Sequence, residues 1–183
     1  MKWALIILGI IGLLVLVVVV VGALLPRDHV ATVTARIGAP PAKVWSAITQ
    51  PDSFMTWRTD LTRVEVLPST STGASWREYG KNGAMTMAIE AADAPRRVTT
   101  RIVDQNLPFG GRWEFEIAPD GVDSSRVTIT DRGWVSNPIF RFVSRYIMGQ
   151  TASLEAFLRA LGKHFGSEPT PSVIASTGAA HGI

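Results

Sequence analysis

No cysteine occurs among the 183 residues of this chain, so disulfides and thiol nucleophiles are excluded. The pattern Asn-x-Ser/Thr is also missing, so there is no acceptor for N-glycosylation. Lysine and arginine number 18 against 15 acidic residues, and no basic block stands out. Nucleic-acid-binding proteins usually carry a basic stripe, so no nucleic-acid partner is expected. The weak positive balance would suit an anionic membrane surface instead.

Motifs of common catalytic and cofactor sites are missing as well. There is no GxSxG nucleophile elbow, and Gly110-Gly111 fits neither a P-loop nor a dinucleotide fingerprint. The three histidines, His29, His164 and His181, do not have the spacing of metal ligands. The sequence therefore predicts neither a metal nor a cofactor.

One long apolar run is present at the N-terminus. The segment from Trp3 to Leu25 contains no charged residue and no proline. About 20 apolar residues cover the roughly 30 Å of a bilayer core as a helix, so this segment is long enough to span. Pro26, Arg27 and Asp28 then end the run. We expect residues 1–26 to form a single transmembrane anchor that contacts lipid over residues 3–25.

A cleaved signal peptide is the rival interpretation of this run. Lys2 supplies a positive start, and Val21-Gly22-Ala23 has the small-residue spacing of a cleavage site. The apolar core of a signal peptide is typically about 7–15 residues, however, and this run is longer. Lys2 favours a cytoplasmic N-terminus. We therefore expect a single-pass membrane protein whose domain lies outside the cytoplasm.

The segment after the anchor begins with a strand and two short helices. Residues 29–37 alternate and are rich in valine and threonine, which is typical of a strand. Pro40-Pro41 then opens a short helix. A second short helical turn ends at Trp57. Helices this short are marginal in water and must pack on a large apolar surface.

A meander of about six strands follows. Turn residues separate the segments, and alternation within them is clean: Trp113, Phe115 and Ile117 share one face. The predicted strands are 62–67, 74–79, 84–91, 97–104, 111–119 and 125–135.

One long amphipathic helix is predicted to close the domain. Asn137-Pro138 is typical of a helix start, and an apolar stripe then extends almost to Gly166. Residues 167–183 are small, polar and proline-containing, so we expect a disordered tail. The predicted fold is α+β. Residues 27–166 form the domain, in which a curved antiparallel sheet wraps around the C-terminal helix. The stripe comprises Phe140, Val143, Ile147, Leu154, Leu158, Leu161 and Phe165.

Three passages carry a family resemblance. They are "IGAPPAKVWSAITQPDSFMTW", "DAPRRVTTRI" and "VTITDRGWVSNPIFRF". With them the chain resembles the START-like, helix-grip superfamily called SRPBCC, in its polyketide cyclase/dehydrase and lipid-transport branch. The resemblance covers residues 30–165. It implies a deep apolar cavity between sheet and helix, with the short helices at its rim. It does not by itself assign a function, because this fold hosts carriers, receptors, enzymes and chaperone activators.

Aromatic, methionine and ionisable side chains are the candidates for lining such a cavity. Tryptophan and methionine also fill cores, and that alternative stays open. Uninterrupted alternation would turn Asp131 inward, while a bulge at Gly133 would turn it to the surface. An inward Asp131 would need a partner, for which Arg101 is conceivable. The full set is Trp57, Trp76, Glu78, Met85, Met87, Arg101, Trp113, Phe115, Asp131, Trp134 and Phe140.

The predicted function is binding or transport of a lipid or another hydrophobic small molecule at the membrane. One alternative is a cyclase/dehydrase-type enzyme that uses Asp131 or Glu78 as general base. Another is a protein-interaction module of the chaperone-activator kind. An open apolar cavity would favour binding, convergent ionisable groups would favour the enzyme, and a filled core would favour the interaction module. The sequence specifies neither the ligand nor the oligomeric state.

Overall fold

The computed structural model describes residues 2–81 and 83–174. Its elements begin with one long helix and end with a short strand. In chain order they are α1 (Lys2–Leu24), β1 (Asp28–Ile37), α2 (Pro41–Thr49), the 3-10 helix η1 (Pro51–Thr56), β2 (Leu61–Thr70), β3 (Gly73–Gly80), β4 (Gly83–Asp93), β5 (Arg97–Ile102), β6 (Phe109–Pro119), β7 (Ser125–Val135), α3 (Pro138–Val143), the π-helix η2 (Ser144–Met148), α4 (Ala152–His164) and β8 (Ser172–Ile174).

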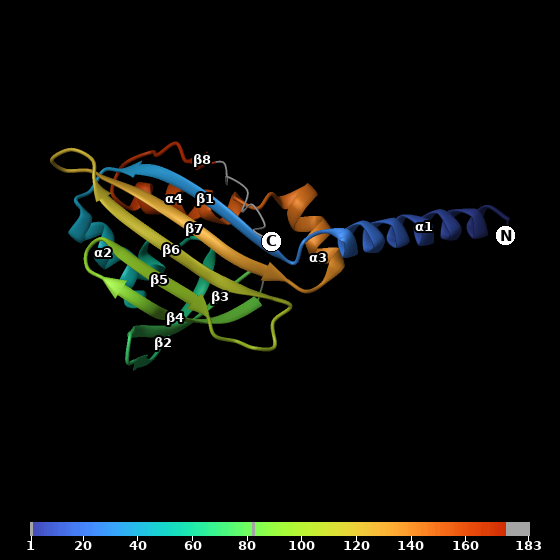
Figure 1. Ribbon diagram of the computed structural model, residues 1–183, viewed down its shortest axis with the longest axis horizontal. Coiled ribbons are helices and arrows are strands. Elements are labelled where there is room, and N and C mark those ends of the chain that lie inside the picture. The colour runs from blue at the N-terminus through green and yellow to red at the C-terminus, as the bar shows by residue number, and fades with distance from the viewer. Residues whose placement is uncertain (1, 82, 175–183) are drawn as a thin grey trace, which may run out of the picture.

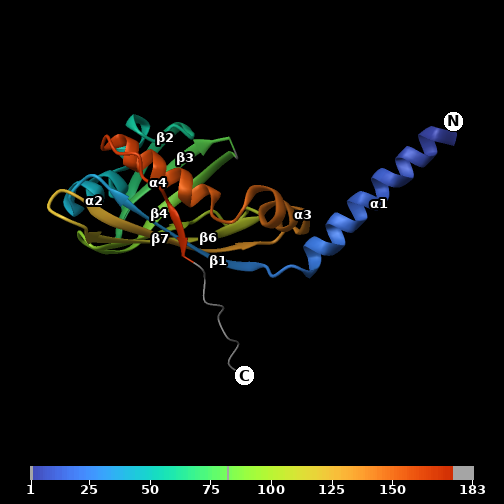
Figure 2. The same ribbon diagram turned by 90° about the horizontal axis from the view of Figure 1, so that it is seen from above.

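A single antiparallel sheet forms the body of the domain. Its eight strands follow the order β2-β3-β4-β5-β6-β7-β1-β8. The sheet curves, and α4 lies along one of its faces (Figures 1 and 2). An antiparallel sheet usually buries one face only, and here α4 supplies its cover. The predicted α+β helix-grip fold is therefore confirmed.

The two short helices close the end of the sheet opposite to α1. Pro41 occupies the first turn of α2, where its missing N–H costs nothing. Val44 and Ile48 are one turn apart and both are buried, as is Phe54 of η1. Neither helix could be stable alone, and their burial explains why they form here.

The predicted long C-terminal helix is interrupted, which corrects the sequence interpretation. Residues 138–148 form α3 and η2, and α4 starts only at Ala152. Between them Gly149 has φ +79° and ψ 138°, which is not a helical conformation. The apolar stripe is divided accordingly: Leu154, Leu158 and Leu161 are fully buried, whereas Phe140 and Ile147 are exposed.

The expected disordered tail is also corrected for residues 167–174. Ser172–Ile174 forms β8, which pairs with β1 at the edge of the sheet. The chain turns back tightly over α4, since a Cβ placed on Gly162 would lie 2.2 Å from Pro169 Cδ. The glycine at 162 permits this return, and strand pairing then fixes the segment. Residues 175–183 lie outside the described residues.

The apolar helix α1 projects from the domain and touches it at α3 (Figures 1 and 2). Its side chains are almost all exposed. Gly22 is buried against Pro138, where an added Cβ would lie 2.0 Å from the Pro138 carbonyl oxygen. Arg141 of α3 donates a hydrogen bond of 2.7 Å to the Leu25 carbonyl oxygen. By length and composition α1 can cross a membrane, as an anchor or as a signal sequence.

Candidate functional site on the inner face of the sheet

The face of the sheet that carries α4, here called the inner face, is set by strand register. Successive side chains of a strand point to opposite faces, so each strand contributes every second residue. In β6 these include Trp113 and Phe115, and in β7 they include Ile129 and Asp131. Phe115 and Ile129 are fully buried, in agreement with this assignment.

An aromatic cluster fills the space beneath α4. The centroid of the Phe157 ring lies 5.2 Å from that of Trp57, 5.7 Å from Trp113 and 5.4 Å from Phe115. The first two contacts are edge-to-face, a favourable arrangement for aromatic rings. These side chains thus form a packed aromatic core beneath α4.

A half-buried apolar area continues the inner face to one side of α4. The backbone of α4 lies nearest to β1 and β7, and its Phe157 also reaches Trp113 and Phe115 of β6. The area is formed by β4, β5 and the start of β6. Met87 lies opposite Ile102 in the register. The area, here called the half-buried apolar face, comprises Met85, Met87, Ile102, Phe109 and Trp113. Methionine suits a surface that must adapt to ligands of irregular shape.

A histidine–aspartate pair lies at the α1 end of the inner face. The distance from His29 Nε2 to Asp131 Oδ2 is 3.2 Å, and the two side chains are 20% and 15% exposed. An ionised carboxylate only accepts hydrogen bonds, so Nε2 of the imidazole donates. Gly133 makes room for the ring, since a Cβ there would lie 2.6 Å from His29 Cε1. The register is unbroken at Gly133, so Asp131 points inward and the bulge considered from the sequence does not form.

The sequence makes Arg101 a conceivable partner for an inward Asp131. In the structure the partner is His29 instead. Arg101 follows the inward Thr100 and points from the outer face, 3.8 Å from Glu90. In the sequence, His29 stands out only as one of three histidines without metal-ligand spacing. The signal that would have found it is the alternation of β1, where His29 shares a face with the buried Ala31.

A second ionisable pair is built into the core. Glu78 is buried, accepts a hydrogen bond from Trp76 Nε1 at 3.3 Å and lies 3.8 Å from Arg58. Arg58 also binds both carboxylate oxygens of Asp60, at 2.8 and 2.7 Å. Burial raises the pKa of Asp60, but the hydrogen bond and charge of Arg58 outweigh it, so the pKa is lowered. These contacts with Trp76 and Arg58 explain the burial of the Glu78 carboxylate as part of the core.

The remaining two candidates lie away from the inner face. Trp134 points from the outer face of β7 and covers Gly110, where a Cβ would lie 2.8 Å from the indole ring. Phe140 is 51% exposed on α3. Trp134 points outward because it alternates with the inward Gly133 and Val135 along β7. Phe140 lies away from the inner face because the C-terminal helix is interrupted.

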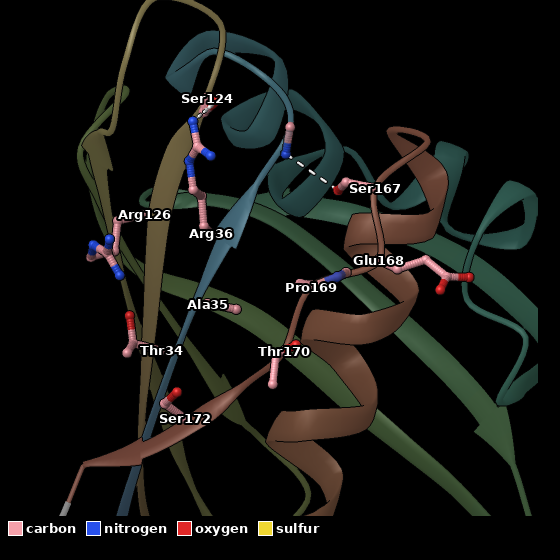
Figure 3. A pocket seen from close by; sticks show the side chains of 11 residues that line it. Thr34, Ala35, Arg36, Ser124, Arg126, Ser167, Glu168, Pro169, Thr170 and Ser172 are labelled. Carbon is pink, nitrogen blue, oxygen red and sulfur yellow. Dashed lines mark hydrogen bonds between the residues drawn. The ribbon is translucent and has the colours of Figure 1, made fainter.

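Two pockets of about 410 Å³ each lie away from the half-buried apolar face. One is formed by β1, the start of β7 and residues 167–172 (Figure 3), and its Arg36 and Arg126 already contact Asp120. The other lies between α2 and the end of α4. Within residues 2–81 and 83–174, no three histidine, aspartate or glutamate side chains are grouped as metal ligands would be.

Most of the chain after α1 matches one family model. Residues 28–166 match the family described as "Polyketide cyclase / dehydrase and lipid transport". The chain belongs to this family. Its members are START-like domains that bind hydrophobic ligands. No curated protein sequence matches the chain.

Solved structures agree with this family assignment at the level of the fold. A START superfamily protein from Mycobacterium smegmatis is 16% identical, with a TM-score of 0.62, over 75% of this chain and 97% of the other. A truncated norcoclaurine synthase from Thalictrum flavum is 13% identical, with a TM-score of 0.60, over 75% and 92%. A conserved protein from Geobacillus kaustophilus is 11% identical, with a TM-score of 0.63, over 78% and 99%. Some structural relatives of this family member are therefore enzymes.

Proposed function

We propose that this family member is a membrane-anchored protein that binds a lipid or another hydrophobic small molecule on the half-buried apolar face. The observation that carries the proposal is this face itself, whose apolar side chains stay only half-buried although α4 covers the neighbouring part of the sheet. Met85 and Met87 supply adaptable apolar surface, and Trp113 joins it to the core. Ligand burial there would contribute about 25 cal/mol for each Å² of apolar surface removed from water.

The His29–Asp131 pair supplies the polar end of this site. Ligand sites usually combine a mainly apolar lining with a few polar groups that fix orientation. The imidazole and the carboxylate are partly exposed and lie on the same inner face, and His29 follows the end of α1 by only a few residues. A ligand leaving the bilayer would meet this pair with its polar group while its apolar part covers the methionines.

Two contacts support α1 as a retained anchor rather than a cleaved signal. The cleavage-like sequence at residues 21–23 is part of the packed junction, in which Gly22 is buried against Pro138. Arg141 donates to the carbonyl oxygens of both Ala23 and Leu25, so the end of α1 is capped by the domain. Lys2 favours a cytoplasmic N-terminus, with the domain on the opposite side.

The experiment is native mass spectrometry with lipid extraction on residues 27–174, released by an engineered protease site from full-length protein that has been purified from the membranes of the host. A lipid or polyketide that co-purifies in stoichiometric amount supports the proposal and identifies the ligand class. A ligand-free protein whose melting temperature does not rise with any member of a hydrophobic ligand panel contradicts it. The range extends to residue 174 because β8 is part of the sheet.

An enzyme that uses Asp131 as general base is the second candidate. The supporting observation is the His29–Asp131 pair, which lies beside the half-buried apolar face and could receive a proton from a bound substrate. Turnover that is lost in Asp131→Asn, while the co-purified ligand is kept, would favour this candidate over simple binding. The interaction module is less well supported, because the packed core beneath α4 continues into an uncovered apolar area.

A further inference from the structure

The helical segment 138–148, made of α3 and η2, has an apolar surface that the domain does not cover. Ile139 and Phe140 are 43% and 51% exposed, and Tyr146 and Ile147 are 60% and 70% exposed. Ile139 and Phe140 belong to α3 and Tyr146 and Ile147 to η2, so both parts of the segment contribute exposed apolar side chains. Arg141, between them, instead faces α1.

The contact with α1 fixes where this surface lies. The Gly22 backbone touches Pro138, so α3 and the end of α1 are in direct contact. With 23 residues α1 is about 35 Å long, which is enough to cross a hydrocarbon core of about 30 Å. If α1 spans the bilayer, its last turn is at the interface, and α3 is held at the same depth.

The chemistry of the segment fits that depth. Tyrosine and phenylalanine beside aliphatic residues are favoured at the boundary between headgroups and acyl chains. Arg27 and Arg145 are exposed near the same junction and can meet lipid phosphates. We infer that segment 138–148 lies in the membrane interface, with Ile139, Phe140, Tyr146 and Ile147 embedded in lipid. This inference rests on the proposed anchor and adds a second, peripheral contact between the domain and the bilayer.

Because the chain has no cysteine, single labels can test this in the full-length protein. Ile147→Cys, carrying an environment-sensitive fluorophore, is reconstituted into vesicles of phosphatidylcholine and phosphatidylglycerol that contain a lipid with a spin label on its acyl chain. Leu14→Cys reports on the anchor. Val122→Cys is the matched control, because it is 95% exposed in the loop between β6 and β7, at the end of the sheet opposite to α1.

Quenching at Ile147→Cys that is severalfold stronger than at Val122→Cys supports the inference. Quenching at Leu14→Cys with equal, weak quenching at the other two positions overturns it while leaving the anchor in place. Absence of quenching at Leu14→Cys overturns the anchor and the inference together, so the two failures are distinguishable. Phe140→Cys provides a second position on the same surface and is expected to behave as Ile147→Cys does.

Discussion

His29 and Asp131, separated by 102 positions in the chain, meet on the inner face with 3.2 Å between Nε2 and Oδ2. The pairing of β1 with β7 brings them together, since Ala31 lies opposite Asp131 and His29 opposite Gly133. A carboxylate that is only 15% exposed needs a hydrogen-bond donor, and the imidazole is that donor.

His29→Ala is expected to lower the free energy of unfolding by about 1 kcal/mol, because the Asp131 carboxylate loses its donor. Urea denaturation of residues 27–174 at neutral pH measures this loss. In the Asp131→Asn background, His29→Ala should cost clearly less, since no charged acceptor remains. Equal costs in the two backgrounds would show that the pair does not couple.

Gly133→Ala is expected to destabilise the domain by about 2 kcal/mol, because the new Cβ would overlap the His29 ring. His29→Ala removes the ring and should relieve most of this cost. The same denaturation assay, carried out on the two single variants and the double variant, measures the relief. A cost that is unchanged in the double variant would point to the backbone rather than to the ring.

Phe157→Ala is expected to cost about 3–5 kcal/mol, because this ring packs on Trp57, Trp113 and Phe115 and its loss leaves a cavity. Phe140→Ala is the matched control within residues 27–174. Its ring is half exposed on α3, so a change within about 0.5 kcal/mol is expected. A small effect at Phe157 would contradict the packed core beneath α4.

Met85→Gln is expected to reduce the amount of co-purified hydrophobic ligand severalfold with little change in melting temperature, because a polar amide replaces part of the half-buried apolar face. Arg101→Gln, on the outer face of the same sheet, is the control and should retain the ligand. Ligand loss in both variants, or in neither, would argue against this face as the binding surface.

Glu155→Gln is expected to destabilise the domain in a pH-dependent way. Hydrogen bonds from Thr151 at 2.8 Å and Arg159 at 2.7 Å lower the pKa of Glu155 below its ordinary value of 4.5. Because the pKa of Glu155 is lower in the folded than in the unfolded state, its ionised carboxylate stabilises the fold at pH values above the pKa of the unfolded state. This contribution disappears as the pH falls through the pKa of the folded state. At pH 7 the loss should be about 0.5 kcal/mol, as for other exposed i,i+4 pairs.

Melting curves recorded from neutral pH down to below the folded pKa check this behaviour. The difference between Glu155→Gln and the wild type should shrink as the pH falls. Glu116→Gln, which removes an exposed cross-strand pair with Arg97, serves as the control for charge removal. A difference that persists unchanged at low pH would mean that shape, and not charge, explains the effect at Glu155.

Local patterns in the sequence determined much of this protein. Alternation identified the strands, because a sheet with one buried face needs every second residue to be apolar. The same alternation predicted Trp113 and Phe115 on the inner face, and the register agrees. The uncharged run at residues 3–25 predicted the long helix, because helix length and composition are properties of the segment itself.

Tertiary structure alone decided the rest. Whether Asp131 points inward depended on whether β1 and β7 pair without a bulge at Gly133, and its partner had to come from a distant strand. The apolar stripe after Pro138 predicted one helix, but Gly149 breaks it, and contact with α1 holds α3 apart from the core. Residues 167–174 looked disordered because their own side chains bury little, and only the open edge of β1 gives them backbone partners. These outcomes depend on contacts between segments far apart in the chain, which no local pattern records.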